Sequence, residues 1–218
     1  GYSSKPNAEF VTEAEEINRI LPVINLILQH FPEVLLSIDT FRSEVAKAAI
    51  ENGAALINDI SAGNLDERMM ETIAHYKVPY VMMHMRGNPE TMQSLTHYNN
   101  IIKEMILYFS EKVAKARSLG INDLILDPGF GFAKTIEQNY EVLQKLELFQ
   151  MLELPILAGV SRKSMIYKLL NINAQEALNG TIVLNTVALT KGAAILRVHD
   201  VKEAMECVTL FNKIHLSK

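Results

Sequence analysis

The sequence has few of the features that mark secreted, membrane or nucleic-acid-binding proteins. Its single cysteine, Cys207, allows no internal disulfide, which is typical of a reducing compartment, and we expect it to be buried on the last helix. No apolar run approaches the roughly 18 to 20 residues that a membrane helix needs, and no signal peptide is visible. No window concentrates Lys and Arg, and the net charge is −4. We therefore expect a soluble cytoplasmic protein without a nucleic-acid or membrane partner.

The chain of 218 residues contains 49% apolar residues, which is enough for one domain over residues 1–218 with a large core. Apolar runs alternate strictly with segments of helical spacing. The runs predict strands near residues 34–38, 54–57, 79–83, 124–126, 155–158 and 194–196. Helices are predicted near residues 12–30, 44–51, 66–76, 98–119, 137–148, 165–191 with a break at 171–173, and 201–214. Uniformly apolar strands alternating with helices predict a parallel sheet covered by helices.

Each predicted strand ends in a polar cluster, and this favours a barrel over an open sheet. The clusters are SIDT, NDISAG, MHMRGNP, DPGFGF, GVSRKS and RVHD. In a (β/α)8 TIM barrel all strand ends meet at one mouth, whereas an open sheet collects its site mainly beside one switch point. The chain begins with a loop and no Met, so we expect two further strands and one helix upstream, with six of the eight βα units in this sequence.

The segment LILDPGFGFAKT at residues 124–135 combines a strand end with a glycine-rich loop. It lacks the glycine that a phosphate-binding P-loop has before its lysine, and Lys134 replaces the third glycine of a dinucleotide fingerprint. Asp127 is therefore either a site residue at a strand end or an incidental residue of an ordinary βα turn. For Lys134 we expect a structural charge in the loop.

The side chains expected at the mouth suit a flat, nitrogen-rich ring that carries an anionic group. Carboxylates and amides accept paired N–H donors, and Arg and Lys bind phosphate. These residues are Asp39, Asn58, His84, Arg86, Asp127, Arg162, Lys163, Arg197, His199 and Asp200. Three alternatives remain: a zinc site using histidines, a glycosidase using Asp39 and Asp127, and simple core packing of His84 and Met83.

Taken together, these motifs resemble the dihydropteroate synthase family. The likeness extends from about residue 2 to the C-terminus. It rests on SSKP at 3–6, SIDT at 37–40, NDISAG at 58–63, MHMRGNPETMQ at 83–93, DPGFGFAKT at 127–135, GVSRKS at 159–164 and RVHD at 197–200. The resemblance implies condensation of 6-hydroxymethyl-7,8-dihydropterin diphosphate with 4-aminobenzoate, with Mg²⁺ as cofactor and sulfonamides as inhibitors. It also implies a homodimer formed through the last helices.

The resemblance assigns a role to each matching position. Asp127, Lys163, Arg197 and His199 would be catalytic. Asp39, Asn58 and Asp127 would hydrogen-bond the pterin, with Lys163 nearby, Ile60 and Met83 as walls, and Arg197 stacked on the ring. Arg197, His199 and Ser4 would bind the diphosphate. Phe132, Pro6, Ser161 and Lys163 would surround the aminobenzoate, and Lys5, Gly159 and Arg162 complete the implied substrate-binding set.

The chain departs from the family pattern at two places. The family carries Thr-Arg-Pro where this sequence has Ser4, Lys5 and Pro6, so the hydroxyl and the charge remain but the two-pronged arginine is lost. The family's Mg²⁺-binding Asn belongs to a first strand that this chain lacks, so we predict no metal ligand here. If those strands are missing from the molecule, we expect an unclosed barrel and no catalysis.

Two other functions remain open at this point. One is a pterin-binding methyltransferase domain that uses methyltetrahydrofolate and shares the Asp and Asn ring contacts. The other is a truncated, catalytically inactive chain that binds pterin. The SRKS and RVHD motifs favour the synthase.

Overall fold

Six parallel strands, in chain order, form the framework of residues 11–215. These are the residues that the computed structural model describes, so the predicted site residues Ser4, Lys5 and Pro6 lie outside the described residues. The strands are β1 (Ser37–Asp39), β2 (Leu56–Asp59), β3 (Tyr80–Met83), β4 (Leu124–Asp127), β5 (Leu157–Ala158) and β6 (Ile195–Leu196). The first four form one sheet and the last two another, and a parallel bridge from Leu126 to Ile156 joins them. The predicted parallel sheet is therefore confirmed.

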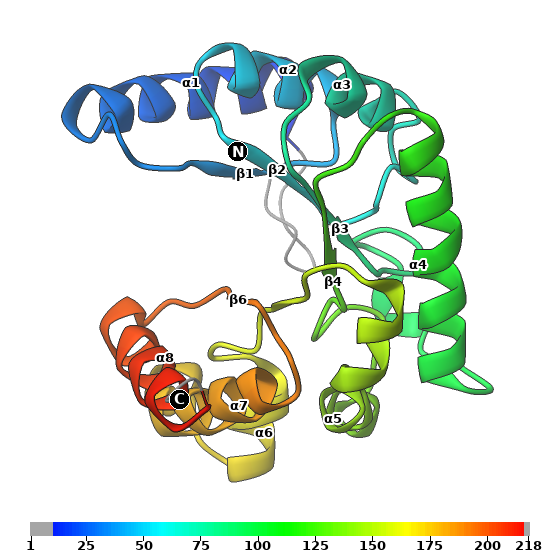
Figure 1. Cartoon of the computed structure of the whole chain (residues 1–218), viewed down its shortest axis with the longest axis vertical. Helices are drawn as coiled ribbons and strands as arrows, with labels where there is room; N and C mark the ends of the chain where they lie inside the picture. The colour runs from blue at the N-terminus through cyan, green and yellow to red at the C-terminus, as the bar shows by residue number, and fades with distance from the viewer. Residues whose placement is uncertain (1–10, 216–218) are drawn as a thin grey trace.

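The helices lie on the outer side of the curved strands, as Figure 1 shows, with α1 and α8 at the two ends of the arc. The α-helices are α1 (Glu13–His30), α2 (Ser43–Glu51), α3 (Met69–Tyr76), α4 (Ile101–Ser118), α5 (Ile136–Gln144), α6 (Ser164–Leu170), α7 (Leu178–Thr190) and α8 (Val201–His215). The short 3-10 helices are η1 (Met92–Ser94), η2 (Leu146–Leu152) and η3 (Ala174–Glu176). This is the pattern of a (β/α)8 barrel, of which residues 11–215 supply six strands. None of the described helices is long and apolar enough to cross a membrane.

Several helix ends follow local signals in the sequence. The Thr12 hydroxyl accepts a hydrogen bond from the Glu15 backbone N–H at 3.3 Å, which caps α1. Thr135 and Gln138 form a reciprocal capping box at the start of α5. Asn171 adopts a left-handed backbone with φ of +54° and ends α6. The predicted helix over 165–191 therefore consists of α6 and α7, and the gap between them is wider than expected because η3 occupies part of it.

Strand register determines which side chains meet at the mouth. Asp39 lies beside Asn58 across β1 and β2, and Met83 lies beside Asp127 across β3 and β4. The apolar core fills the space between strands and helices, and its largest side chains include Tyr80, Phe109 and Phe149, which are fully buried. Because that core holds the strands rigidly, the polar residues at their carboxyl ends have fixed relative positions.

Candidate functional site

Asp127 is the centre of the site at the carboxyl ends of the strands. Its carboxylate is fully buried at the end of β4. Arg197, which follows β6, donates to Asp127 Oδ2 at 2.7 Å and to Asn58 Oδ1 at 3.1 Å. The other carboxylate oxygen, Oδ1, accepts from the Gly129 backbone N–H at 2.8 Å. Three segments far apart in the sequence are thus joined by charge-assisted hydrogen bonds.

Two further charged groups face this cluster. The protein atoms around the Asp39 carboxylate displace water, and this desolvation raises its pKa. The positive charge of Arg197 and a hydrogen bond from Asn58 act in the opposite direction. Burial lowers the pKa of Lys163 to about 8, although attraction to Asp127 acts in the opposite direction. Lys163 Nζ donates to the Phe130 carbonyl. The site therefore holds two carboxylates and two cations whose charges depend on one another.

The guanidinium of Arg197 lies directly over the backbone at the end of β5. A Cβ atom on Gly159 would be 2.8 Å from Arg197 Nη2, so any larger residue would displace the guanidinium from this position. Nearby, Ser161 Oγ and His199 Nδ1 are 2.9 Å apart, and the His199 backbone N–H donates to Ser161 Oγ at 3.2 Å. The structure thus brings Gly159, Ser161, Arg197 and His199 together beside β5 and β6.

An apolar wall adjoins the charged groups, since Met83 pairs with Asp127 in the strand register. Ile60, Met83 and Phe132 belong to one apolar cluster, in which Ile60 and Met83 are buried and Phe132 is half-buried. The Lys163 ammonium lies 5.1 Å from the centre of the Phe132 ring. The two residues expected as walls of the pterin pocket, Ile60 and Met83, therefore pack with the residue expected beside the aminobenzoate, Phe132.

The Arg162 side chain is held by hydrogen bonds to other groups of the protein. Its guanidinium donates to both carboxylate oxygens of Asp200, at 2.8 and 2.7 Å. It also donates to the carbonyls of Ala174 at 3.0 Å and Gln175 at 2.6 Å. With its donors used in this way, Arg162 stabilises the loop after β5 against η3 and the start of α8. The backbone of Arg162 is left-handed, with φ of +52°. Its expected part in substrate binding stays a prediction.

Lys134 and Asn139 are two residues near the site to which the sequence motifs assign no role in binding or catalysis. Both are buried, at 6% and 2% exposure, and both hydrogen-bond the loop between β4 and α5. The structural charge expected at Lys134 agrees with these contacts. Nothing in its local sequence indicates that the ammonium is enclosed, since a lysine in a glycine-rich loop is ordinarily solvated.

The donor groups that the structure places together decide whether a metal ion fits the site. Within residues 11–215 no group of three or more His, Cys, Asp or Glu side chains could hold a metal ion. His84 is buried and its ring contacts Lys134, so it packs in the core, which was one of the alternatives. The described residues thus do not fit a dedicated Mg²⁺ or zinc site by themselves, and we derive no chemical step through a metal.

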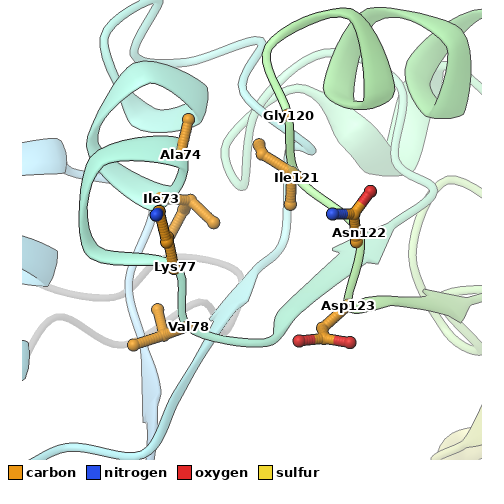
Figure 2. A pocket seen from close by; sticks show the side chains of 8 residues that line it. All are labelled: Ile73, Ala74, Lys77, Val78, Gly120, Ile121, Asn122 and Asp123. Atoms are coloured by element: carbon orange, nitrogen blue, oxygen red, sulfur yellow. The ribbon is translucent and has the colours of Figure 1, made fainter.

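A cavity of about 370 Å³ lies at the opposite end of the sheet (Figure 2). Its lining comes from the end of α3 and from residues 120–123, which precede β4. Lys77 and Asp123 are the charged residues in that lining. Reactive side chains in this architecture lie at the carboxyl ends of strands, whereas the amino ends serve stability. We therefore place the functional site at Asp127 and Arg197 and not in this cavity.

Known proteins resemble this chain over nearly its whole length. Residues 1–199 match the family described as pterin binding enzymes. Dihydropteroate synthase of Escherichia coli K12 is 42% identical over 210 residues, which cover 95% of this chain and 74% of that protein. The Synechocystis protein of the same name is 44% identical over 208 residues, with 94% and 71% coverage.

Solved structures show the same likeness in three dimensions. Yersinia pestis dihydropteroate synthase in complex with a sulfonamide drug superposes with a TM-score of 0.95 at 37% identity, covering 100% of this chain and 79% of that one. Xanthomonas albilineans dihydropteroate synthase with 4-aminobenzoic acid gives 0.92 at 33% identity, with 100% and 78% coverage.

Proposed function

Because the chain belongs to the dihydropteroate synthase family of pterin-binding enzymes, we propose that it joins 4-aminobenzoate to 6-hydroxymethyl-7,8-dihydropterin diphosphate. The products are 7,8-dihydropteroate, for folate synthesis, and diphosphate. The observation that carries this proposal is the pairing of Arg197 with Asp127 Oδ2 and Asn58 Oδ1. Two adjacent N–H donors already occupy these oxygens, and the amino and ring N–H groups of a pterin present the same donor pattern.

Binding of the pterin requires the Arg197 guanidinium to leave these two oxygens. In the proposed complex Asp127 and Asn58 accept from the edge of the ring, and Asp39 lies next to Asn58 in the strand register. Ile60 and Met83 contact one face of the ring, since they form the apolar wall of the site. Arg197 then stacks on the other face, where its planar cation is attracted to the ring and to the diphosphate.

The reaction exchanges one bond of the pterin methylene carbon for another. The C–O bond to the diphosphate breaks, and the departing diphosphate keeps the electron pair. The amine nitrogen of aminobenzoate forms the new C–N bond, and its proton passes to the released diphosphate or to water. Where C–O cleavage runs ahead of attack, positive charge develops on the methylene carbon. The buried Asp127 carboxylate stabilises that charge, while Arg197 and Lys163 stabilise the departing anion.

The remaining site residues contact either the anionic groups of the substrates or the aminobenzoate ring. His199 and Ser161 lie beside Arg197 and can donate hydrogen bonds to the diphosphate or to a carboxylate. Phe132 and Lys163 border the space proposed for aminobenzoate. Mg²⁺ as the cofactor of the diphosphate remains part of the proposal and rests on the family resemblance alone.

The test is release of diphosphate by the purified chain. We expect release to require both the pterin diphosphate and 4-aminobenzoate, and a sulfonamide to inhibit it competitively with 4-aminobenzoate. Binding of the pterin without any release would identify the chain as a pterin-binding protein without this activity. Methyl transfer from methyltetrahydrofolate would instead support the methyltransferase alternative, which the names of the relatives do not favour.

We further propose that two copies of the chain associate through α7 and α8, in the cytoplasm. Val183 on α7 and Met205, Leu210 and Ile214 on α8 are exposed apolar side chains, with exposures of 52 to 75%. Their burial in a dimer would be favourable. Sedimentation equilibrium should then give about twice the chain mass of 24.5 kDa, and Leu210→Glu should return it to the monomer mass. A monomer at all concentrations for the unaltered protein would contradict this proposal.

A further inference from the structure

The ammonium group of Lys134 forms a complete set of hydrogen bonds inside the loop after β4. Its Nζ atom lies 3.1 Å from the Gly129 carbonyl, 3.0 Å from the Phe132 carbonyl and 3.1 Å from His84 Nδ1. An ammonium has three donors, and these are three acceptors. All three hydrogen-bond partners are neutral, so the direct contacts of Lys134 connect two backbone carbonyls with a distant side chain and form no ion pair.

His84 is the fixed end of this connection. It follows β3 directly, is 2% exposed, and its backbone N–H donates to the Asp127 carbonyl at 2.9 Å. Burial, with the nearby positive charge of Lys134, holds the pKa of His84 well below its usual value. A neutral imidazole has a free nitrogen lone pair, so its Nδ1 can accept from the ammonium.

The backbone of this loop has left-handed conformations that cost free energy, so contacts with other groups are needed to hold it. Ala133 has φ of +49°, a left-handed conformation that a residue other than glycine rarely adopts. Gly129 has φ of +68°, and a Cβ atom there would be 2.3 Å from the His84 carbonyl oxygen. Side chains from outside the loop also bind it: Asn139 accepts from the Gly131 N–H at 2.7 Å, and the Tyr98 hydroxyl donates to the Ala133 carbonyl at 2.9 Å.

Phe132 is the residue whose position depends on this arrangement. Lys134 binds the Phe132 carbonyl directly, and the Phe132 ring lies 5.1 Å from the Lys163 ammonium, on the rim of the site. We propose that Lys134 is a positioning residue for the aromatic amine: it holds residues 128–133 in the conformation in which Phe132 borders that substrate. This inference rests on the proposed function. Lys134 itself does not touch the reacting atoms.

The kinetic test uses Lys134→Met, which keeps the length of the side chain and removes its donors. We expect KM for 4-aminobenzoate to rise about tenfold or more, and KM for the pterin diphosphate to change less than about twofold. Lys145→Met is the matched control, because Lys145 is a half-exposed lysine at the end of α5 that pairs with Glu141. It should match the unaltered protein in both constants.

A second measurement does not depend on activity. Amide hydrogen exchange of peptides covering residues 128–135 should become at least about tenfold faster in Lys134→Met and remain unchanged in Lys145→Met. If Lys134→Met fails to fold, Tyr98→Phe loosens the same loop by one hydrogen bond and should raise KM for 4-aminobenzoate in the same selective way.

The outcomes separate the two proposals. Unchanged loop exchange, or equal rises in both KM values, would overturn the positioning role of Lys134. If the unaltered protein releases no diphosphate but the loop still loosens in Lys134→Met, the proposed function fails while the structural connection stands. In that case calorimetric titration of a sulfonamide in the presence of pterin diphosphate replaces KM as the measure of the aromatic subsite.

Discussion

Replacing Asp127 by Asn should reduce kcat by about a thousandfold or more, in a protein that still folds but has a lower Tm because the ion pair of this buried carboxylate with Arg197 is lost. The substitution keeps the shape of the side chain but removes its charge. It also places an amide N–H₂ group against the Arg197 guanidinium, where a carboxylate oxygen now accepts at 2.7 Å. The variant therefore keeps one acceptor oxygen but loses the other, and it loses the negative charge that stabilises positive charge on the pterin methylene carbon. Diphosphate release under saturating substrates is the measurement.

The matched control for Asp127→Asn is Asp123→Asn. Asp123 is an exposed aspartate just before the same strand, at the opposite end from the site. Its variant should retain the kcat of the unaltered protein. Thermal unfolding of both variants shows whether the loss of activity follows from chemistry or from misfolding. Near-normal kcat in a folded Asp127→Asn protein would sink the assignment of this residue.

Lys163→Met should lower kcat/KM by roughly a hundredfold or more, because it removes a cation that lies among Asp127, Arg197 and Phe132.

The kcat/KM of the unaltered protein should also fall as the pH rises through about 8. Burial lowers the pKa of Lys163 to about 8, so the lysine is protonated below that pH and neutral above it. The measurement is kcat/KM between about pH 6 and 9.5.

Two variants distinguish Lys163 from other groups that titrate in this range. Lys163→Arg keeps the positive charge, so its kcat/KM should no longer fall at alkaline pH. Lys168 is an exposed lysine on α6, and Lys168→Met should leave both kcat/KM and its pH profile unchanged. Burial also lowers the pKa of Lys134 to about 7, so the profile of Lys134→Met is needed to separate its contribution. An alkaline decrease that persists in Lys163→Arg would show that another group is responsible.

The sequence alone determined the architecture and the middle of the site. Uniformly apolar runs alternating with amphipathic segments can be buried only as parallel strands under helices, and the carboxyl ends of such strands converge. For that reason the order of residues along the chain is enough to assign Asp39, Asn58, Asp127 and Arg197 to one mouth. The start of α1 was also predictable, because Thr12 caps the helix that the sequence predicts near residues 12–30.

Only the tertiary structure decided where the side chains of the connecting loops point. Arg162 and Lys163 are neighbours in the sequence, yet one pairs with Asp200 and the other faces Asp127, because the left-handed backbone at Arg162 turns the chain between them. Asn58 and Asp59 likewise differ: Asn58 binds Arg197, and Asp59 binds Tyr80 and the loop at Ser61. The burial of Lys134 depends on His84, fifty positions earlier. A residue type indicates what chemistry is available, but the backbone conformation and the packing of distant segments decide which residues use it.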